Sequence, residues 1–142
     1  MPQAVDPYWI IEDGLLRIVY VIRSEVPYPD LESLEPSYEG LLARLDRVGR
    51  EGKAVIVDFR NGPPPRNDEA FERATRPYRR RIFEGFVAGG VLVRTASGRM
   101  QLTRTSREDE GVYVVASEEH ELQAYLDERL DEAGVERATG ID

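Results

Sequence analysis

Two apolar runs near the beginning of the chain flank a short polar turn. The runs cover residues 8–11 and 15–22, and Glu12, Asp13 and Gly14 lie between them. An Asp-Gly pair between runs rich in β-branched and aromatic residues is a strong signal for a β-hairpin, because tight hairpin turns need residues that tolerate a positive φ. The chain therefore begins with a predicted hairpin.

A loop over residues 24–34 leads into the next two predicted elements. Residues 36–48 carry apolar side chains at helical spacing and are followed by Gly49, which predicts a helix that ends at a glycine. Its apolar stripe consists of Tyr38, Leu41, Leu42, Leu45 and Val48. Residues 54–59 are almost continuously apolar, as expected of a strand that is covered on both faces of a sheet.

A second predicted helix follows that strand. It begins after Asn67 or Asp68, either of which can cap it. Its inward stripe consists of Phe71, Ala74, Tyr78, Ile82 and Phe86. Pro77 lies inside this pattern and predicts a kink or a split, because proline lacks the N–H group of a helical hydrogen bond.

The remaining chain alternates in the same way. After the glycines at positions 85, 89 and 90, residues 91–95 form a predicted strand, and residues 112–115 form the last one. Residues 97–108 permit a strand by their alternation, whereas a parallel sheet needs a crossover helix here, and we favour the helix. Ser117 caps the final predicted helix, whose inward residues are Leu122, Tyr125, Leu126 and Leu130.

Together these elements predict one α/β domain over residues 1–142. An N-terminal hairpin followed by alternating helices and strands gives a mixed, mostly parallel sheet of about five strands, flanked by about four helices. A chain of 142 residues is long enough for one hydrophobic core. The ordered core is expected over about residues 8–133, and residues 134–142 are expected to form a frayed tail.

Composition narrows the class of protein. Hydrophobic residues make up 41% and charged residues 32% of the chain, which fits an ordinary globular protein rather than a disordered one. The absence of cysteine excludes disulfides, thiol chemistry and thiolate metal sites. No apolar run approaches the roughly 20 residues of a membrane span, and the N-terminus lacks a secretory pattern, so we expect a cytoplasmic protein.

The net charge of -8 is unevenly distributed along the chain. Residues 60–107 contain 11 arginines and four acidic residues, so the rest of the chain is strongly acidic. This overall acidity disfavours nonspecific binding to nucleic acid. The basic segment either pairs with acidic residues on solvated helix faces or presents a local surface for an anion or an acidic protein partner.

The loop after the predicted central strand is the first candidate site, because ligands of α/β sheets bind beyond the carboxyl ends of strands. It contains no nucleophile, metal-ligand cluster or phosphate-binding glycine pattern. Helical spacing places Arg66, Arg73 and Arg80 roughly on one side, and Arg76 with Arg79 on another. The candidate residues for binding a partner or an anion are Arg66, Asn67, Asp68, Arg73, Arg76 and Arg80.

Other single residues support no catalytic or metal site. His120 is the only histidine, and it lies among acidic residues at the start of a predicted surface helix. Asp58 could bind a cation or act as a base, but one carboxylate makes a weak metal site, and pairing with an arginine such as Arg66 is favoured. We therefore predict no catalytic residue, metal or cofactor. Three aromatic residues are assigned to core packing: Trp9, Tyr20 and Phe59.

The order of the predicted elements resembles that of the SpoIIAA-like proteins, which are STAS/Sec14-type domains. The similarity is carried by residues 54–59, 91–104 and 112–126, and it covers most of the chain. It implies a small noncatalytic module that regulates by binding a protein partner, and it supports a helix over residues 97–108. Sec14-type relatives imply, as an alternative, a protein that binds a small apolar ligand.

In the STAS group, antagonists of anti-sigma factors switch partners when a serine at the start of the helix after the central strand is phosphorylated. A helix N-terminus responds strongly to added negative charge, which explains that position physically. The matching stretch here, residues 62–69, contains no serine or threonine. Ser97, at the next strand-to-helix turn, is the remaining phosphorylation candidate and is also a plausible helix cap.

Overall fold

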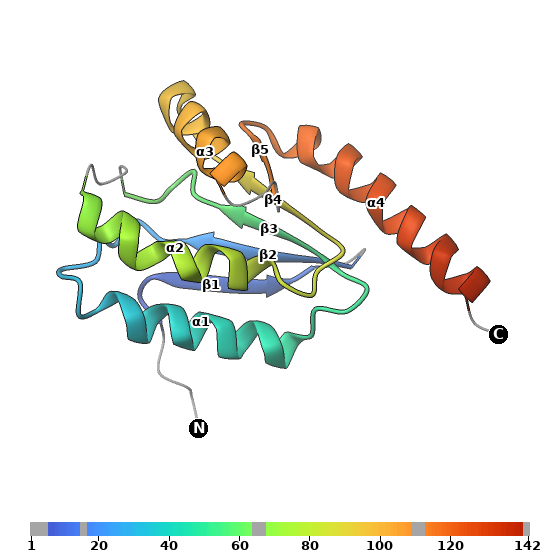
Figure 1. The fold of residues 1–142 in the computed structure, drawn as a ribbon, viewed down its shortest axis with the longest axis horizontal. Coiled ribbons are helices and arrows are strands. Elements are labelled where there is room, and N and C mark those ends of the chain that lie inside the picture. Colours follow the sequence, from blue (N-terminus) through green and yellow to red (C-terminus); the bar gives the residue numbers. More distant parts are fainter. Residues whose placement is uncertain (1–5, 15–16, 64–67, 109–112, 141–142) are drawn as a thin grey trace.

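The computed structural model describes residues 6–14, 17–63, 68–108 and 113–140. Within these ranges the protein is an α/β domain with one five-stranded sheet and four helices (Figure 1). The strands are β1 (Trp9–Asp13), β2 (Ile18–Arg23), β3 (Ala54–Asp58), β4 (Ala88–Leu92) and β5 (Val114–Ala116). The helices are α1 (Leu34–Val48), α2 (Glu69–Phe83), α3 (Ala96–Glu108) and α4 (Glu119–Gly140).

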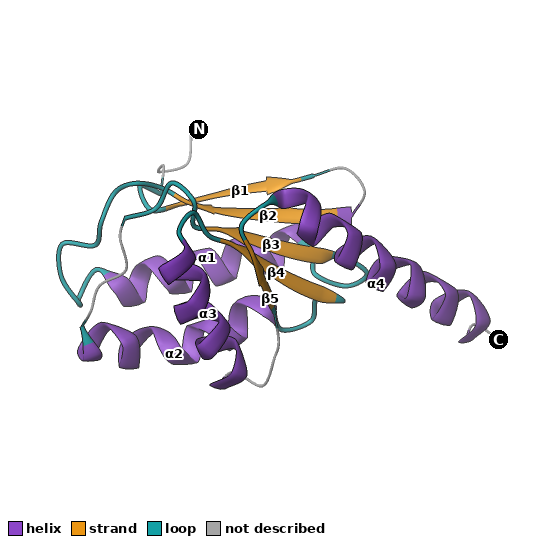
Figure 2. Cartoon of the chain, turned by 90° about the horizontal axis from the view of Figure 1, so that it is seen from above, coloured by secondary structure: helices purple, strands orange, loops and turns teal. Residues whose placement is uncertain are grey.

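The strands lie in the sheet in their chain order, β1-β2-β3-β4-β5 (Figure 2). β1 pairs antiparallel with β2, and every later pair is parallel. Because each crossover moves one strand in the same direction, right-handed connections place α1, α2 and α3 on the same face. α4 packs on the opposite face, where it contacts β4 and β5.

Each face of the sheet has its own hydrophobic core. Alternate residues of the central strands point to opposite faces, so Val55 and Val57 pack toward α1 and α2, whereas Ile56 packs toward α4. The α4 side is filled by leucines at helical spacing, namely Leu122, Leu126 and Leu130. All five residues of β3 are buried or partly buried, which confirms the predicted strand with two covered faces.

Arg23 at the end of β2 is a buried charged residue, with 5% of its surface exposed. Its guanidinium lies over the rings of Tyr28, Tyr8 and Trp9, at 4.7, 5.5 and 5.6 Å from their centroids. It also donates to the carbonyl oxygens of Tyr8 and Ser24, at 3.2 and 3.0 Å. Cation–π contacts and backbone hydrogen bonds therefore replace the water that burial removes from this charge.

The same aromatic group ties the hairpin to α1. The indole Nε1 of Trp9 donates to the Tyr28 hydroxyl at 2.8 Å, and that hydroxyl lies 2.7 Å from the Ser37 hydroxyl on α1. Trp9 also meets the ring of Tyr38 edge-on at 5.7 Å. The hairpin is consequently fixed against α1 by polar contacts as well as by apolar burial.

A second arginine closes the C-terminal end of α2. Nη1 of Arg50 donates to the carbonyl oxygens of Arg81 and Glu84, both at 2.7 Å, and Nε of Arg50 donates to the Asp46 carboxylate at 3.0 Å. The last carbonyl groups of a helix have no partner inside the helix, and a cation there is stabilising. Arg50 thus joins the end of α1 to the end of α2, which lie side by side in Figure 1.

The predicted α/β class, the hairpin and all four helices are confirmed. The segment over residues 97–108, for which strand and helix were both considered, lies within helix α3. Asp68 is the N-cap of α2, and its carboxylate accepts a hydrogen bond from the Ala70 N–H. Among the described residues, none of the helices has the length and apolar character that a bilayer crossing requires.

Several expectations about element boundaries differ from the structure. β1 extends to Asp13, so Glu12 and Asp13, which were assigned to the turn, belong to the strand. The strand expected over residues 91–95 ends at Leu92, and β5 covers Val114–Ala116 instead of residues 112–115. The split at Pro77 is wrong, because α2 continues through it; Pro77 lies on the exposed face, where water can replace the hydrogen bond that proline removes. β4 begins at Ala88, so Gly89 and Gly90 belong to the strand instead of preceding it. The chain is helical to Gly140, although a frayed tail was expected from residue 134.

Gly90 lies in β4 because α4 approaches the sheet closely there. A Cβ atom on Gly90 would lie 2.9 Å from both Cδ atoms of Leu122, which is itself buried. A Cβ atom on Gly40, in the exposed middle of α1, would meet nothing within 4 Å. The two glycines therefore have opposite expected responses to the same substitution.

Replacing Arg23 by methionine should destabilise the fold by about 1–3 kcal/mol, because the carbonyl groups of Tyr8 and Ser24 lose a charged donor and the rings lose their cation. The exposed Arg47→Met variant is the control, and it should change the free energy of unfolding by less than about 0.5 kcal/mol. Urea unfolding measures both. Equal stability of the two variants would contradict the structural role given to Arg23.

The glycine pair gives a matched prediction. Gly90→Ala should lower the free energy of unfolding by about 1–3 kcal/mol through overpacking against Leu122. Gly40→Ala should raise it by about 0.5–1 kcal/mol, because alanine is the better helix former at an exposed position. Thermal and urea unfolding of both variants check the signs, and a stabilised Gly90→Ala protein would show that α4 does not pack this closely.

Candidate functional site

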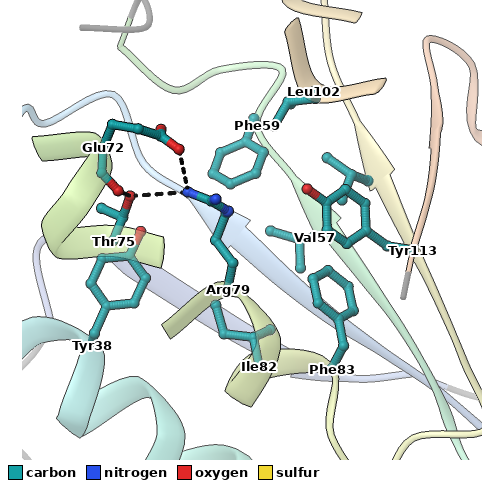
Figure 3. Close-up of a pocket in the computed structure, with 11 residues that line it drawn as sticks. Tyr38, Val57, Phe59, Glu72, Thr75, Arg79, Ile82, Phe83, Leu102 and Tyr113 are labelled. Carbon is teal, nitrogen blue, oxygen red and sulfur yellow. Dashed lines mark hydrogen bonds and ion pairs between the residues drawn. The ribbon is translucent and has the colours of Figure 1, made fainter. Parts of the chain in front are cut away.

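A cavity of about 170 Å³ lies on the side of the sheet covered by α1, α2 and α3 (Figure 3). It is lined by residues of α2, α3 and the sheet, and by Tyr38 of α1. Its apolar wall consists of Val57, Phe59, Ile82, Phe83, Val91, Leu102 and Tyr113. We call this space the aromatic cavity, because Phe59, Phe83 and Tyr113 supply much of that wall.

The register of β3 and β4 determines which side chains of the sheet line the aromatic cavity. Val57 of β3 and Val91 of β4 are direct neighbours in the parallel ladder, and both are buried on the α2 side. Phe59 continues the ladder beyond β3, because its N–H donates to the Leu92 carbonyl at 2.9 Å. Phe83 and Tyr113 stack with ring centroids 4.8 Å apart, so residues distant in the sequence form one wall.

One helix face supplies the polar edge of the cavity. Glu72, Thr75 and Arg79 follow one another at spacings of three and four residues, which places them on the same face of α2. Nη1 of Arg79 donates to the Glu72 carboxylate at 3.0 Å and to the Thr75 hydroxyl at 3.4 Å (Figure 3). The Arg79 side chain is 13% exposed and that of Glu72 is 42% exposed, so the cation is the inner member of the ion pair.

Tyr38 contributes a hydroxyl group from α1. The residue is 7% exposed, and its ring stacks on that of Tyr78 with centroids 5.0 Å apart. Burial raises the pKa of the Tyr38 hydroxyl far above its ordinary range, so this group remains a protonated donor at neutral pH. Its titration also responds to Arg79 and Glu72, which places it near the polar edge of the cavity.

The Tyr38 hydroxyl has no hydrogen-bond partner among the described residues. Every fully enclosed side-chain nitrogen or oxygen in that part of the chain does have a partner. It follows that the Tyr38 oxygen borders open space, and Tyr38 lines the aromatic cavity. The polar edge therefore combines a guanidinium, a carboxylate and two hydroxyl groups.

This arrangement suits binding better than bond making. The Thr75 hydroxyl donates to the Glu72 carbonyl at 3.1 Å and accepts from Arg79, so no base activates it among the described residues. Within the same ranges, no group of three or more histidine or acidic side chains lies close enough to hold a metal ion. The cavity offers an apolar surface with a few orienting polar groups, which is the usual character of a small-molecule site.

The loop after β3 contains an ion pair between two of its own residues, Asp58 and Arg60. Asp58 accepts from Nε and Nη2 of Arg60, at 3.0 and 2.9 Å, and also from the Arg60 backbone N–H at 2.9 Å. The Asp58 side chain is only 13% exposed. Pairing with an arginine is thus confirmed, with Arg60 as the partner. The predicted candidates Arg66 and Asn67 lie outside the described residues.

The predicted arginine candidates on α2 lie away from the aromatic cavity. Arg73, Arg76 and Arg80 are exposed on the outer side of the helix, and we call this surface the outer arginine face. Arg73 forms an exposed ion pair with Glu69 at 3.5 Å. The sequence placed Arg76 beside Arg79, which is wrong, because Arg79 turns inward while Arg76 is exposed with Arg73 and Arg80.

The remaining sequence candidates have simple structural surroundings. Thr95, and not Ser97, caps α3, because its Oγ1 accepts from the Gly98 N–H at 3.0 Å. Ser97 is exposed one residue into the helix, so its phosphorylation stays a prediction. His120 is exposed in the first turn of α4. Trp9 is buried, as expected of a core residue.

Sequence reasoning did not identify Glu72 and Thr75 as site residues, and it considered Arg79 only as one of several arginines on this helix. Glu72, Thr75 and Arg79 are charged or polar, and such residues are normally assigned to the solvated face of a helix. Their spacing nevertheless follows the inward stripe that includes Ile82, and this was the available signal. Nothing local in the sequence indicated that Tyr38 and Tyr113 would meet at the same cavity.

Comparison with protein-family models, with curated proteins and with solved structures gives no match for this chain. The resemblance to SpoIIAA-like proteins consequently stays a hypothesis that rests on the order of elements.

Proposed function

We propose that the protein is a noncatalytic binding module that takes a small apolar molecule into the aromatic cavity. The observation that carries the proposal is the cavity itself, of about 170 Å³ and walled by aromatic and aliphatic side chains. An apolar protein cavity of about 150 Å³ is large enough to bind benzene, so this one suits a molecule of about six to ten non-hydrogen atoms.

The polar groups support binding over catalysis. General acid–base chemistry needs a group of suitable pKa within hydrogen-bond reach of the reacting atom, and covalent chemistry needs a nucleophile beside a base. Among the described residues of the cavity, Thr75 is the aliphatic hydroxyl group, and its neighbour Arg79 is not a base. These groups are instead placed to orient a bound molecule.

The proposed ligand agrees with one implication of the family resemblance. Sec14-type domains are associated with apolar ligands, and the cavity lies between helices and sheet, as expected of such a site. The size of the cavity favours a compact molecule over a complete lipid, because a long acyl chain needs a much larger space.

Filling the cavity from α3 should abolish binding. Leu102 lines the cavity, so Leu102→Trp should weaken the binding of toluene by at least about tenfold through steric overlap. Met100 lies on the same helix and is 68% exposed, so Met100→Trp is the matched control and should bind as the wild type does. Ligand-observed NMR with toluene measures this, and circular dichroism checks that both variants are folded.

Two results would contradict the binding proposal. The first is a wild-type protein that does not bind toluene. The second is a folded Leu102→Trp protein that binds toluene as tightly as the Met100→Trp control, since binding would then occur elsewhere.

A second candidate function is interaction with an acidic protein partner, as expected of a regulatory STAS-like module. It is favoured by the outer arginine face, where Arg73, Arg76 and Arg80 are exposed together on one side of α2. Guanidinium groups recognise carboxylates with paired hydrogen bonds. This surface is separate from the aromatic cavity, so one chain can accommodate both functions.

Reversing the charge of the outer arginine face should abolish the binding of an acidic protein partner. In pull-downs from extracts of the native host, Arg76→Glu/Arg80→Glu should reduce a specifically bound protein by at least about tenfold, because like charges would then face each other. Arg47→Glu/Arg129→Glu changes the net charge equally at exposed positions on α1 and α4, and should retain the partner. Identical partners for all three proteins would remove the outer arginine face from the function.

A further inference from the structure

The inner position of Arg79 identifies the charge of the ligand. Resting on the proposed function, we infer that the molecule bound in the aromatic cavity is a small aromatic carboxylate whose carboxylate group replaces Glu72 beside Arg79. The apolar ring would lie against the aromatic wall, and the Tyr38 hydroxyl would complete the contacts of the carboxylate.

The first step is the asymmetry of the ion pair. The Arg79 side chain is 13% exposed and lies inside the cavity edge, whereas the Glu72 side chain is 42% exposed and reaches toward solvent. A buried guanidinium needs a partner when water leaves, but a half-exposed carboxylate can turn to water at small cost. An incoming carboxylate can therefore exchange with Glu72 while Arg79 stays in place.

The second step is the Tyr38 hydroxyl. The Thr75 hydroxyl accepts from Nη1 of Arg79 at 3.4 Å and donates to the Glu72 carbonyl at 3.1 Å, so its own proton is already engaged. The Tyr38 hydroxyl is more than nine-tenths buried, borders the cavity and has no partner among the described residues. A protonated hydroxyl in that position donates to an anion, and hydrogen bonds to charged acceptors are stronger than those to neutral ones.

The third step is the shape of the apolar space. Phe83 and Tyr113 stack at 4.8 Å and, with Phe59, present ring surfaces to the cavity. Aromatic rings gain from offset or edge contacts with other rings beyond the area that they bury. A cavity of about 170 Å³ has room for one ring with a short substituent.

Cationic, neutral and doubly charged ligands fit the cavity less well than a single carboxylate does. A cationic ligand would lie beside Arg79 and would have to displace the buried member of the ion pair. A neutral aromatic molecule leaves the pair from Glu72 to Arg79 intact, but it gains nothing from the guanidinium. Arg79 is the one cation among the described residues that line the cavity, which matches a single carboxylate better than a doubly charged phosphate.

Benzoate and benzamide distinguish these cases, because they have nearly the same shape and differ in charge. Titration followed by NMR should show that wild-type protein binds benzoate at least about tenfold more tightly than benzamide. Glu72→Gln should increase the affinity for benzoate severalfold and leave the affinity for benzamide nearly unchanged, because the carboxylate that competes for Arg79 has been removed. Arg79→Gln should reduce the affinity for benzoate to that for benzamide.

Arg80→Gln is the matched control on the same helix, because it removes one exposed positive charge from the outer arginine face. It should retain the preference for benzoate. If Arg79→Gln does not fold, the wild-type comparison and the Glu72→Gln variant still decide the question, since neither removes a buried group.

The two levels of the proposal fail separately. If the protein binds toluene but has equal affinities for benzoate and benzamide, the carboxylate inference is wrong, while the proposal of a binding module is retained. If none of toluene, benzamide and benzoate binds to the protein, the proposal of a binding module is itself overturned. A Glu72→Gln protein that binds benzoate more weakly than the wild type would show that Glu72 is not displaced.

Discussion

Three parallel crossovers in one direction constrain the rest of this structure. Because β2, β3, β4 and β5 follow one another across the sheet, right-handed connections place α1, α2 and α3 on one face. α4 alone covers the other face among the described elements, and it packs closely enough that Gly90 meets Leu122. The three helices on the first face cannot fill it completely, and the space between α2 and α3 is the aromatic cavity.

Arginine has different physical roles in this chain, according to where its guanidinium lies. Arg23 is enclosed by aromatic rings and ties the hairpin to its surroundings, and Arg50 satisfies the last carbonyl groups of α2. Arg79 lines the cavity, whereas Arg73 forms only an exposed ion pair. A count of positive charges in the sequence does not separate these roles, because burial, and not charge, distinguishes them.

The loop after β3 shows how position alone can mislead. It lies where ligands of α/β sheets usually bind, yet the Asp58 carboxylate is held by Arg60 through both of its oxygens. The better-formed space lies on the α2 side of the same strand, where Val57 and Phe59 form part of its wall. A carboxylate that is already paired with its own neighbouring arginine is a structural unit.

Local periodicity by itself determined most of the elements of this protein, whereas α3 was ambiguous between strand and helix. The apolar stripe of α1, the continuous apolar run of β3, the Asp68 cap and the leucines of α4 are all properties of neighbouring residues, and they predicted the α/β fold. Only the tertiary structure decided that Tyr38, Arg79 and Tyr113 line one cavity. Those residues come from segments far apart in the chain, and the gap between them depends on how closely each helix packs, which no local pattern records.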